Sequence, residues 1–292
     1  MARPALSASR TTAVLDLLTA FPGRAFTMAE IVRATKINVA SCHAVLAALT
    51  SRGYLTRLPQ KTYVLGPALI AVGHASRLSQ PLVARAQDAA RELFEETGLP
   101  VLLSTVVGGD ILALTSLVDK AGRSAGMRLG QRMPLEPPLG AHFVAWASEE
   151  TIEEWIARGG DDDPELAPAW REALALVRRR GYQVTLGTSM ETEFASLMAE
   201  MASGRQPIEY HDQATSLVAT HPWRLAQPET IEPTERYDVV LIAAPIFDQT
   251  GEARLSLCLG GFSEKLTGAQ ITAYADQLLR TCLKVMREDR GS

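Results

Sequence analysis

Cysteine, aromatic residues and long apolar runs are all scarce in this chain of 292 residues. The three cysteines, Cys42, Cys258 and Cys282, are too far apart for a disulfide framework or a zinc-binding pair. The longest strongly apolar run, 239–247, is far shorter than the roughly 20 residues of a transmembrane helix. The opening MARPALSASRTT has no apolar stretch, so we expect no signal peptide. These absences favour a protein of the reducing cytoplasm with no membrane partner.

Sequence signatures of catalysis are also missing. The chain has no G-x-S-x-G elbow, no H-E-x-x-H motif, no Walker A loop and no G-x-G-x-x-G fingerprint. His211, Asp212 and His221 could bind a metal, and His142 faces an unknown partner in an expected helix, but scattered histidines are common in a chain of this length. We therefore expect no enzyme activity, no catalytic residue, no metal and no cofactor.

Charge is distributed unevenly along the chain. Residues 1–76 hold eight basic and two acidic side chains, a net charge of +6, whereas the whole chain carries −4 and the remainder therefore −10. A basic first part and an acidic body suit a small anion-binding module attached to a second domain. The alternative is a solvated surface with accidental asymmetry.

Residues 27–50 have the pattern of two short helices joined by a tight corner. Thr27 and Glu30 form a capping box for the first helix, and Asn38 is a good N-cap for the second. Two such helices are typical of a helix-turn-helix, whose second helix enters the DNA major groove, or of a plain helical hairpin in a core. The predicted buried residues are Met28, Ile31, Val32, Ile37, Cys42, Val45, Leu46 and Leu49.

The flanking segments extend this motif into a winged helix. Residues 9–21 read as a helix, and 54–58 and 62–65 as the strands of a hairpin whose tip is 59–61. A linker helix is expected over 67–78 and a long helix over 82–97. We predict a winged helix-turn-helix domain at 1–66, a linker at 67–80 and a second domain at 81–292.

The second domain mixes strands and helices. Its strands are expected at 100–107, 110–118, 182–186, 237–247 and 252–259, with a hairpin signal at Gly108-Gly109. Its helices are expected at 139–147, 149–157 and 168–180, and after a capping box of Thr267 and Gln270. This order predicts an α+β fold with an antiparallel sheet.

Several motifs, taken in their order and spacing, resemble the IclR family of bacterial transcriptional regulators. They are the winged helix with YVLG at 63–66, the helical linker, GQRMPL at 130–135 with LGA at 139–141, RGY at 180–182, and AAPIFD at 243–248 followed by Gly251. The resemblance covers most of the chain. It implies an N-terminal DNA-binding domain and a C-terminal GAF-like domain that binds a small effector. It also implies homodimers, or dimers of dimers, on palindromic operator DNA.

The expected recognition helix departs from the family pattern. Where the family has Ser-Thr-Val-x-Arg, this chain has Ala-Ser-Cys-His-Ala at 40–44. Ala44 therefore replaces the arginine that would form two hydrogen bonds with a guanine. We predict weak base readout, with more reliance on phosphates, the wing and DNA shape, and His43 is either a reader or a plain surface residue. The predicted DNA contacts are Thr27, Lys36, Asn38, Ala40, Ser41, His43, Ala44, Arg57, Gln60 and Lys61, with Arg10, Arg24 and Arg52 as further phosphate ligands.

The implied effector site departs as well. Family members hold small oxo-acids through backbone amides, an acidic residue, a cysteine and two serines. The corresponding positions here are Gly140, Ala141, Leu241, Cys258 and Gly260, with no assignable acid. Because an unpaired carboxylate is costly to bury in an apolar site, we predict an effector larger and more apolar than pyruvate, for example aromatic or steroid-like. The alternative is that these residues simply fill the core.

An insertion over 187–236 separates the RGY and AAPIFD segments. It holds an amphipathic helical pattern at 190–201, then Pro207, His211, His221 and Pro222-Trp223. It could cover the effector site or extend a dimer interface, and Trp223 is either a partner contact or a local core plug. The whole sequence thus predicts an effector-responsive transcriptional regulator. The alternatives are a ligand sensor without DNA binding and, less favoured, a metal-dependent enzyme.

Overall fold

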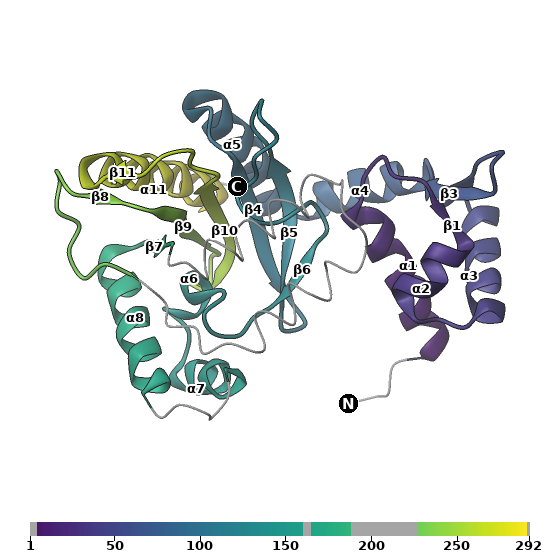
Figure 1. Ribbon diagram of the computed structural model, residues 1–292, viewed down its shortest axis with the longest axis horizontal. Coiled ribbons are helices and arrows are strands. Elements are labelled where there is room, and N and C mark those ends of the chain that lie inside the picture. Colours follow the sequence, from purple (N-terminus) through teal and green to yellow (C-terminus); the bar gives the residue numbers. More distant parts are fainter. Residues whose placement is uncertain (1–4, 160–164, 188–226, 291–292) are drawn as a thin grey trace. The chain divides into compact units, whose positions relative to one another are not determined.

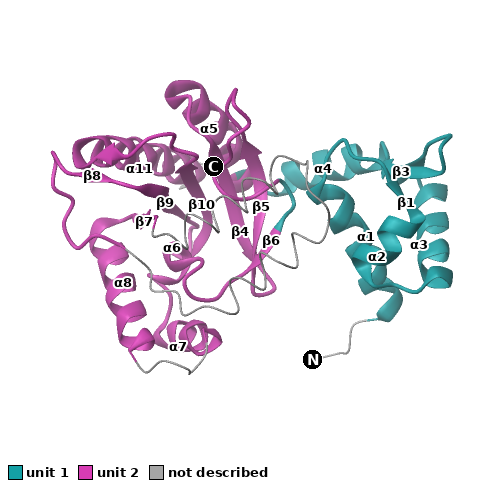
Figure 2. Ribbon diagram, viewed as in Figure 1, with its two compact units in different colours: residues 1–81, 129–131 teal, residues 82–128, 132–292 magenta. Residues whose placement is uncertain are grey.

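The structure, a computed structural model, describes residues 5–159, 165–187 and 227–290 (Figure 1). It divides into two compact units, residues 1–81 with 129–131 and residues 82–128 with 132–292 (Figure 2). The helix predicted at 190–201 and the residues Pro207, His211, Asp212, His221 and Trp223 lie outside the described residues.

The first unit contains the predicted helix-turn-helix. Its helices are α1 (Leu6–Ala20), α2 (Met28–Thr35), α3 (Val39–Ser51) and α4 (Ala68–Ser79). The capping box is present: the Glu30 amide donates to Thr27 Oγ1 over 3.3 Å, and the Thr27 amide donates to Glu30 Oε2 over 2.8 Å. Asn38 Oδ1 caps α3 by accepting from the Ser41 amide over 2.9 Å. The predicted face of α3 is buried, and it consists of Cys42, Val45, Leu46 and Leu49. Ile37, at the corner between α2 and α3, is buried as well.

The wing is a three-stranded sheet rather than a hairpin alone. The predicted strands appear as β2 (Leu55–Arg57) and β3 (Thr62–Leu65), and β1 (Phe26–Thr27) adds to them in the order β1-β3-β2. Two-residue strands such as β1 carry too little periodicity to be found from sequence. At the end of the wing the Gly66 amide donates to the Tyr54 carbonyl over 2.7 Å. A Cβ at Gly66 would lie 2.2 Å from the Gly53 carbonyl oxygen, so this approach requires glycine.

The second unit is built on a six-stranded sheet with the order β6-β5-β4-β10-β9-β7, in which every neighbouring pair is antiparallel. Its strands are β4 (Val101–Val107), β5 (Asp110–Leu117), β6 (Arg132–Pro134), β7 (Gln183–Leu186), β9 (Val239–Phe247) and β10 (Ala253–Gly260). The antiparallel α+β fold is therefore confirmed.

Two details of the predicted strands are wrong. The strand expected over 237–247 is interrupted at Asp238, because β8 (Arg236–Tyr237) turns away and pairs with β11 (Leu266–Thr267) in a separate two-stranded sheet. The three-residue strand β6 was not predicted, because so short a segment has no readable alternation.

Helices cover both faces of the large sheet (Figure 1). The helices α5 (Pro81–Thr97) and α11 (Gly268–Arg290) pack on one face, where Leu255, Leu257 and Leu259 of β10 point. The helices α6 (Ala141–Val144), α7 (Glu149–Arg158) and α8 (Leu166–Arg180) cover the other, where Cys258 points. Successive side chains of a strand alternate between faces, so Ser256 and Gly260 belong with Cys258. We call this second side the inner face.

The helix expected over 139–147 is much shorter than predicted. Residues 137–140 form a turn, and α6 spans only Ala141–Val144. Gly140 has φ of 78°, a left-handed conformation that cannot continue a right-handed helix backwards. A Cβ at this position would also lie 2.3 Å from Leu135 Cδ1, so any other residue here would require the Leu135 side chain to move.

Candidate DNA interface and effector site

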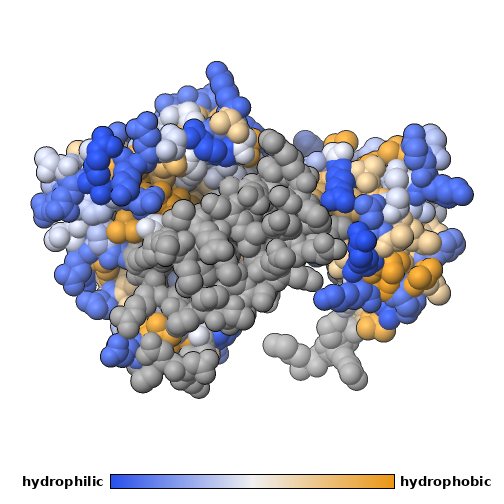
Figure 3. Space-filling model, in the orientation of Figure 1, coloured by the Kyte–Doolittle hydropathy of each residue, from blue (hydrophilic) through white to orange (hydrophobic). Residues whose placement is uncertain are grey.

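The outer face of α3 is rich in methyl groups. Ala40, His43 and Ala44 are exposed, and Val39 is 57% exposed at the start of the helix. Figure 3 shows hydrophobic surface where α2 and α3 lie in this view. His43 is the one polar side chain among Ala40, His43 and Ala44, so hydrogen-bonded readout of bases from these three positions rests on a single imidazole.

Three other predicted readers are engaged in the fold of the first unit. Thr27 donates from its hydroxyl to Glu30 Oε2 over 2.8 Å, and Asn38 is occupied by the α3 cap. Ser41 is half-buried rather than exposed, and its Oγ accepts a hydrogen bond from Arg10 Nη1 over 2.9 Å. The hydrogen bond between Ser41 and Arg10 thus joins α3 to α1. This is a structural role that was not part of the predicted DNA contacts.

Exposed polar and basic groups surround the recognition helix. Arg57, Gln60 and Lys61 are exposed on the wing, and Lys61 adopts a left-handed backbone with φ of 59° at its tip. Lys36 is exposed at the end of α2, and Arg52 at the end of α3. Exposed side chains of these types are able to contact phosphates.

Arg24, a predicted phosphate ligand, also makes contacts within the first unit. Its Nη2 lies 3.0 Å from Glu30 Oε1, and its guanidinium lies over the Phe26 ring at 4.7 Å from the centroid. Hydrogen bonds from Thr27 and the charge of Arg24 lower the pKa of Glu30. The ion pair links the segment before β1 to the first turn of α2.

The predicted effector residues come together around the inner face. In the strand register Gly260 lies opposite Leu241, and Cys258 lies opposite Ala243. Ala141 and Cys258 belong to one buried core, against which Leu241 packs. Gly140 immediately precedes this group as the N-cap of α6.

Two of these positions are tightly packed. A Cβ at Gly260 would lie 3.0 Å from the Ala125 Cα, so Ala125 takes the space that a serine side chain would need. Cys258 is 1% exposed, and burial raises the pKa of its thiol to about 12. Neither Cys258 nor Gly260 offers the hydroxyl group of the serine expected at its position from the IclR resemblance.

Other polar side chains on this face were missed by sequence reasoning. Ser256 and Ser104 are fully buried and lie opposite each other on β10 and β4, with Ser256 Oγ 3.5 Å from Cys258 Sγ. Gln183 is buried on β7 opposite Ala243. The alternation Leu-Ser-Leu-Cys-Leu-Gly along 255–260 was the available signal, because it places the small polar residues together on one side.

A histidine completes this polar group. His142 of α6 is 5% exposed, and its Nδ1 lies 2.9 Å from Gln183 Oε1. Burial lowers the pKa of His142 to about 4, although the bond to Gln183 opposes that shift, so the ring is neutral near pH 7. The apolar core is thus interrupted by a neutral, hydrogen-bonded imidazole beside the predicted effector residues.

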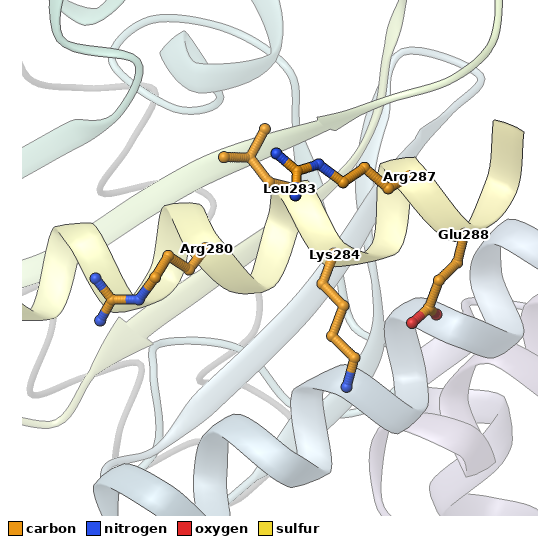
Figure 4. A pocket seen from close by; sticks show the side chains of 5 residues that line it. All are labelled: Arg280, Leu283, Lys284, Arg287 and Glu288. Carbon is orange, nitrogen blue, oxygen red and sulfur yellow. The ribbon is translucent and has the colours of Figure 1, made fainter.

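A shallow surface pocket lies on the opposite side of the sheet, along α11 (Figure 4). It is lined by Arg280, Leu283, Lys284, Arg287 and Glu288. Lys284 Nζ lies 2.6 Å from Glu92 Oε2 on α5, so its charge is already balanced. This pocket shares no residue with the inner face. Within the described ranges, no group of three or more His, Cys, Asp or Glu side chains is placed to hold a metal.

Comparisons with known proteins agree with this architecture. The IclR helix-turn-helix domain matches residues 7–59. The Pca regulon regulatory protein of Pseudomonas putida is 28% identical over 138 residues, which are 46% of this chain and 47% of that protein. The match therefore spans about half the length of this curated relative.

Solved structures resemble nearly the whole chain. An IclR transcriptional regulator from Alicyclobacillus acidocaldarius has a TM-score of 0.70 and 20% identity, with 98% of this chain and 100% of that chain covered. An IclR homologue from Microbacterium hydrocarbonoxydans, complexed with 4-hydroxybenzoate, has a TM-score of 0.63 and 17% identity over the same shares. At these identities the likeness establishes the fold.

The chain combines a winged helix-turn-helix, a motif that commonly binds DNA, with an antiparallel sheet domain. The helix-turn-helix of residues 7–59 matches the IclR helix-turn-helix domain, and nearly the whole chain shares the fold of a solved IclR transcriptional regulator. Among the described helices, none is long and apolar enough to cross a membrane.

Proposed function

We propose that this protein is an effector-responsive transcriptional regulator that binds double-stranded operator DNA through its first unit and a small molecule through its second. The observation that carries the proposal is a complete helix-turn-helix whose recognition helix leaves Ala40, His43 and Ala44 exposed. Such a face has no role in the core, and it fits the major groove.

The DNA contacts follow from the exposed groups. Ala40 and Ala44 touch thymine methyl groups, and His43 reads one base edge. Arg57, Gln60 and Lys61 of the wing contact the backbone or the minor groove, while Lys36 and Arg52 contact phosphates. The binding is accordingly strongly salt-dependent.

The effector is larger and more apolar than pyruvate. The predicted effector positions on the inner face are apolar or small, and none of them is an acidic or basic residue. The Microbacterium homologue complexed with 4-hydroxybenzoate supports an aromatic effector. Effector binding is coupled to DNA affinity through α4 and α5, which requires that the effector bind the two regulatory states with different affinity.

The protein acts as a homodimer or a dimer of dimers. None of the residues of α4 is buried, and Ile70 and Leu78 are 76% and 71% exposed. These two residues are eight positions apart and therefore lie on one side of the helix. A second copy of α4 covers this side and pairs the two winged helices on a palindrome. The protein has no enzyme activity, and it works in the cytoplasm, where its DNA is.

Deleting the gene tests the regulatory role. Transcripts of the neighbouring genes should change several-fold in the deletion strain and return to their original level when the wild-type chain is supplied. The Arg57→Glu variant, which reverses one wing charge, should fail to restore them. Unchanged neighbouring transcripts, with the protein present in the parent strain, would remove the proposed local regulation.

A further inference from the structure

The contacts of Gln183 determine which nitrogen of His142 carries the hydrogen. Gln183 Oε1 lies 3.2 Å from the backbone nitrogen of His142 and 2.9 Å from its Nδ1. A backbone N–H can only donate, so the amide atom that faces it is the oxygen. The nitrogen end of the same amide donates to Thr185 Oγ1 over 2.9 Å. The same oxygen faces His142 Nδ1, and an oxygen of this kind only accepts. Nδ1 of the imidazole therefore carries the hydrogen, and Nε2 holds the lone pair.

His142 Nε2 is therefore a buried hydrogen-bond acceptor. In the part of the chain that the structure describes, no donor lies within hydrogen-bonding distance of it. An unsatisfied buried acceptor is unfavourable, because it has lost water without gaining a partner. Protonation does not remove this unpaired acceptor near pH 7, since burial lowers the pKa of the ring to about 4.

The imidazole belongs to the same side of the sheet as the predicted effector residues. The helix α6 contacts β9, β10 and α8. Gln183 lies opposite Ala243 on β9, and Ala243 lies opposite Cys258 on β10. The residue before His142 is Ala141, which lines the same core as Cys258. A ligand held at these residues would therefore lie on the same side of the sheet as the imidazole.

We propose that His142 Nε2 accepts a hydrogen bond from a neutral hydroxyl group of the effector, so that the effector is an apolar molecule bearing an alcohol or phenol. This inference rests on the proposed effector site. An ether at the same place has no hydrogen to give. A carboxylate would set its lone pairs against that of Nε2. His142 is thus a specificity-determining residue that selects for a donor.

Matched probe pairs test this selection by calorimetry on the full chain at pH 7.5. The pairs are phenol and anisole, cyclohexanol and methoxycyclohexane, and 4-hydroxybenzoate and 4-methoxybenzoate. At least one hydroxylated probe should bind, and should do so about tenfold or more tightly than its ether. In His142→Leu that ratio should fall to about one, while Gln183 Oε1 keeps its backbone donor. The control Lys120→Leu, which puts the same apolar residue at an exposed position of the second unit, should keep the ratio.

Nitrogen NMR of the imidazole gives a second readout that does not depend on folding of a variant. The Nε2 resonance of His142 should fall in the range of an unprotonated nitrogen and shift toward the hydrogen-bonded range when the hydroxylated probe is added. A protonated Nε2, ethers that bind as tightly as their hydroxylated partners, or no binding by any hydroxylated probe would each overturn the inference. DNA binding is measured separately, so its presence in those cases leaves the regulatory proposal intact.

Discussion

Arg10 of α1 donates a hydrogen bond from Nη1 to Oγ of Ser41 on the recognition helix, over 2.9 Å. Both residues were predicted DNA contacts, yet the structure pairs them with each other. If the pair acts as a unit that orients α3, Ser41→Ala and Arg10→Gln should each weaken operator binding, and the double variant should be little worse than the poorer single one. Fluorescence anisotropy with labelled operator measures this cycle.

Independent roles would give a different result for the same cycle. If Ser41 read a base and Arg10 a phosphate, the two losses of binding free energy would add. Ser51→Ala is the matched control, because that hydroxyl is exposed at the end of α3 and bonds only the Ala48 carbonyl. Its operator affinity should equal that of the wild type.

Lys61 tests the contact of the wing with phosphate. It is exposed at the wing tip, so Lys61→Ala should weaken binding similarly on all DNA sequences and reduce the salt slope by about one. Lys120→Ala removes an exposed lysine of the second unit and should leave the slope unchanged. A slope that is unaltered in Lys61→Ala would place this residue outside the interface.

Ala44 tests the position of α3 in the groove. Arginine there restores the bidentate guanine reader expected from the family pattern, a contact worth about 1–3 kcal/mol of discrimination. Ala44→Arg should therefore raise affinity and shift the preferred operator toward guanine. Ala175→Arg adds the same charge at an exposed position of α8 and should change neither. No effect of Ala44→Arg on affinity or preference would mean that α3 does not enter the groove.

His142 makes the stability of the second unit depend on pH. Its folded pKa is lowered to about 4, while the unfolded value is near 6.5. The unfolded state therefore binds the proton first as pH falls, so the contribution of this group is complete above pH 6.5 and declines between 6.5 and 4. At pH 5 the loss is about 2 kcal/mol relative to pH 7.5.

Urea unfolding at the two pH values measures this loss. Trp155 and Trp170 lie in the inner-face core, so their fluorescence reports on the same unit. His142→Leu should be less sensitive to the change in pH by about the amount given above. Asp248 does not interfere: burial would raise the pKa of its carboxyl, but hydrogen bonds from Thr250, Arg254 and backbone amides outweigh this and lower it to about 2. Equal pH dependence in the two proteins would show that His142 is not the responsible group.

Local patterns were enough to predict the first unit. Capping residues and helical periodicity act within a few positions, so Thr27, Asn38 and the buried face of α3 could be read from the sequence. Hydrogen bonds between residues far apart in the chain could not be predicted in this way. The bond between Arg10 and Ser41 joins residues 31 positions apart, and nothing in either segment indicates it. The ion pair of Arg24 with Glu30 was likewise not predicted.

The second unit shows the same division. The strand pair around Gly108-Gly109 and the Thr267 capping box were predicted and are present. The polar group on the inner face depends on the register of β7, β9 and β10, which no single segment specifies. Sequence reasoning therefore kept the family positions, such as Cys258 and Gly260, and missed Gln183 beside His142.

Binding to the DNA that flanks its own gene tests the account most directly. The dissociation constant of the purified chain would be measured on that DNA and on an unrelated fragment of equal length, each at two salt concentrations. We predict tighter binding to the flanking DNA, with affinity on both fragments falling steeply as salt rises. Equal binding to both fragments, or no binding to either at low salt, would contradict a sequence-specific regulator and would favour a ligand sensor that acts without DNA.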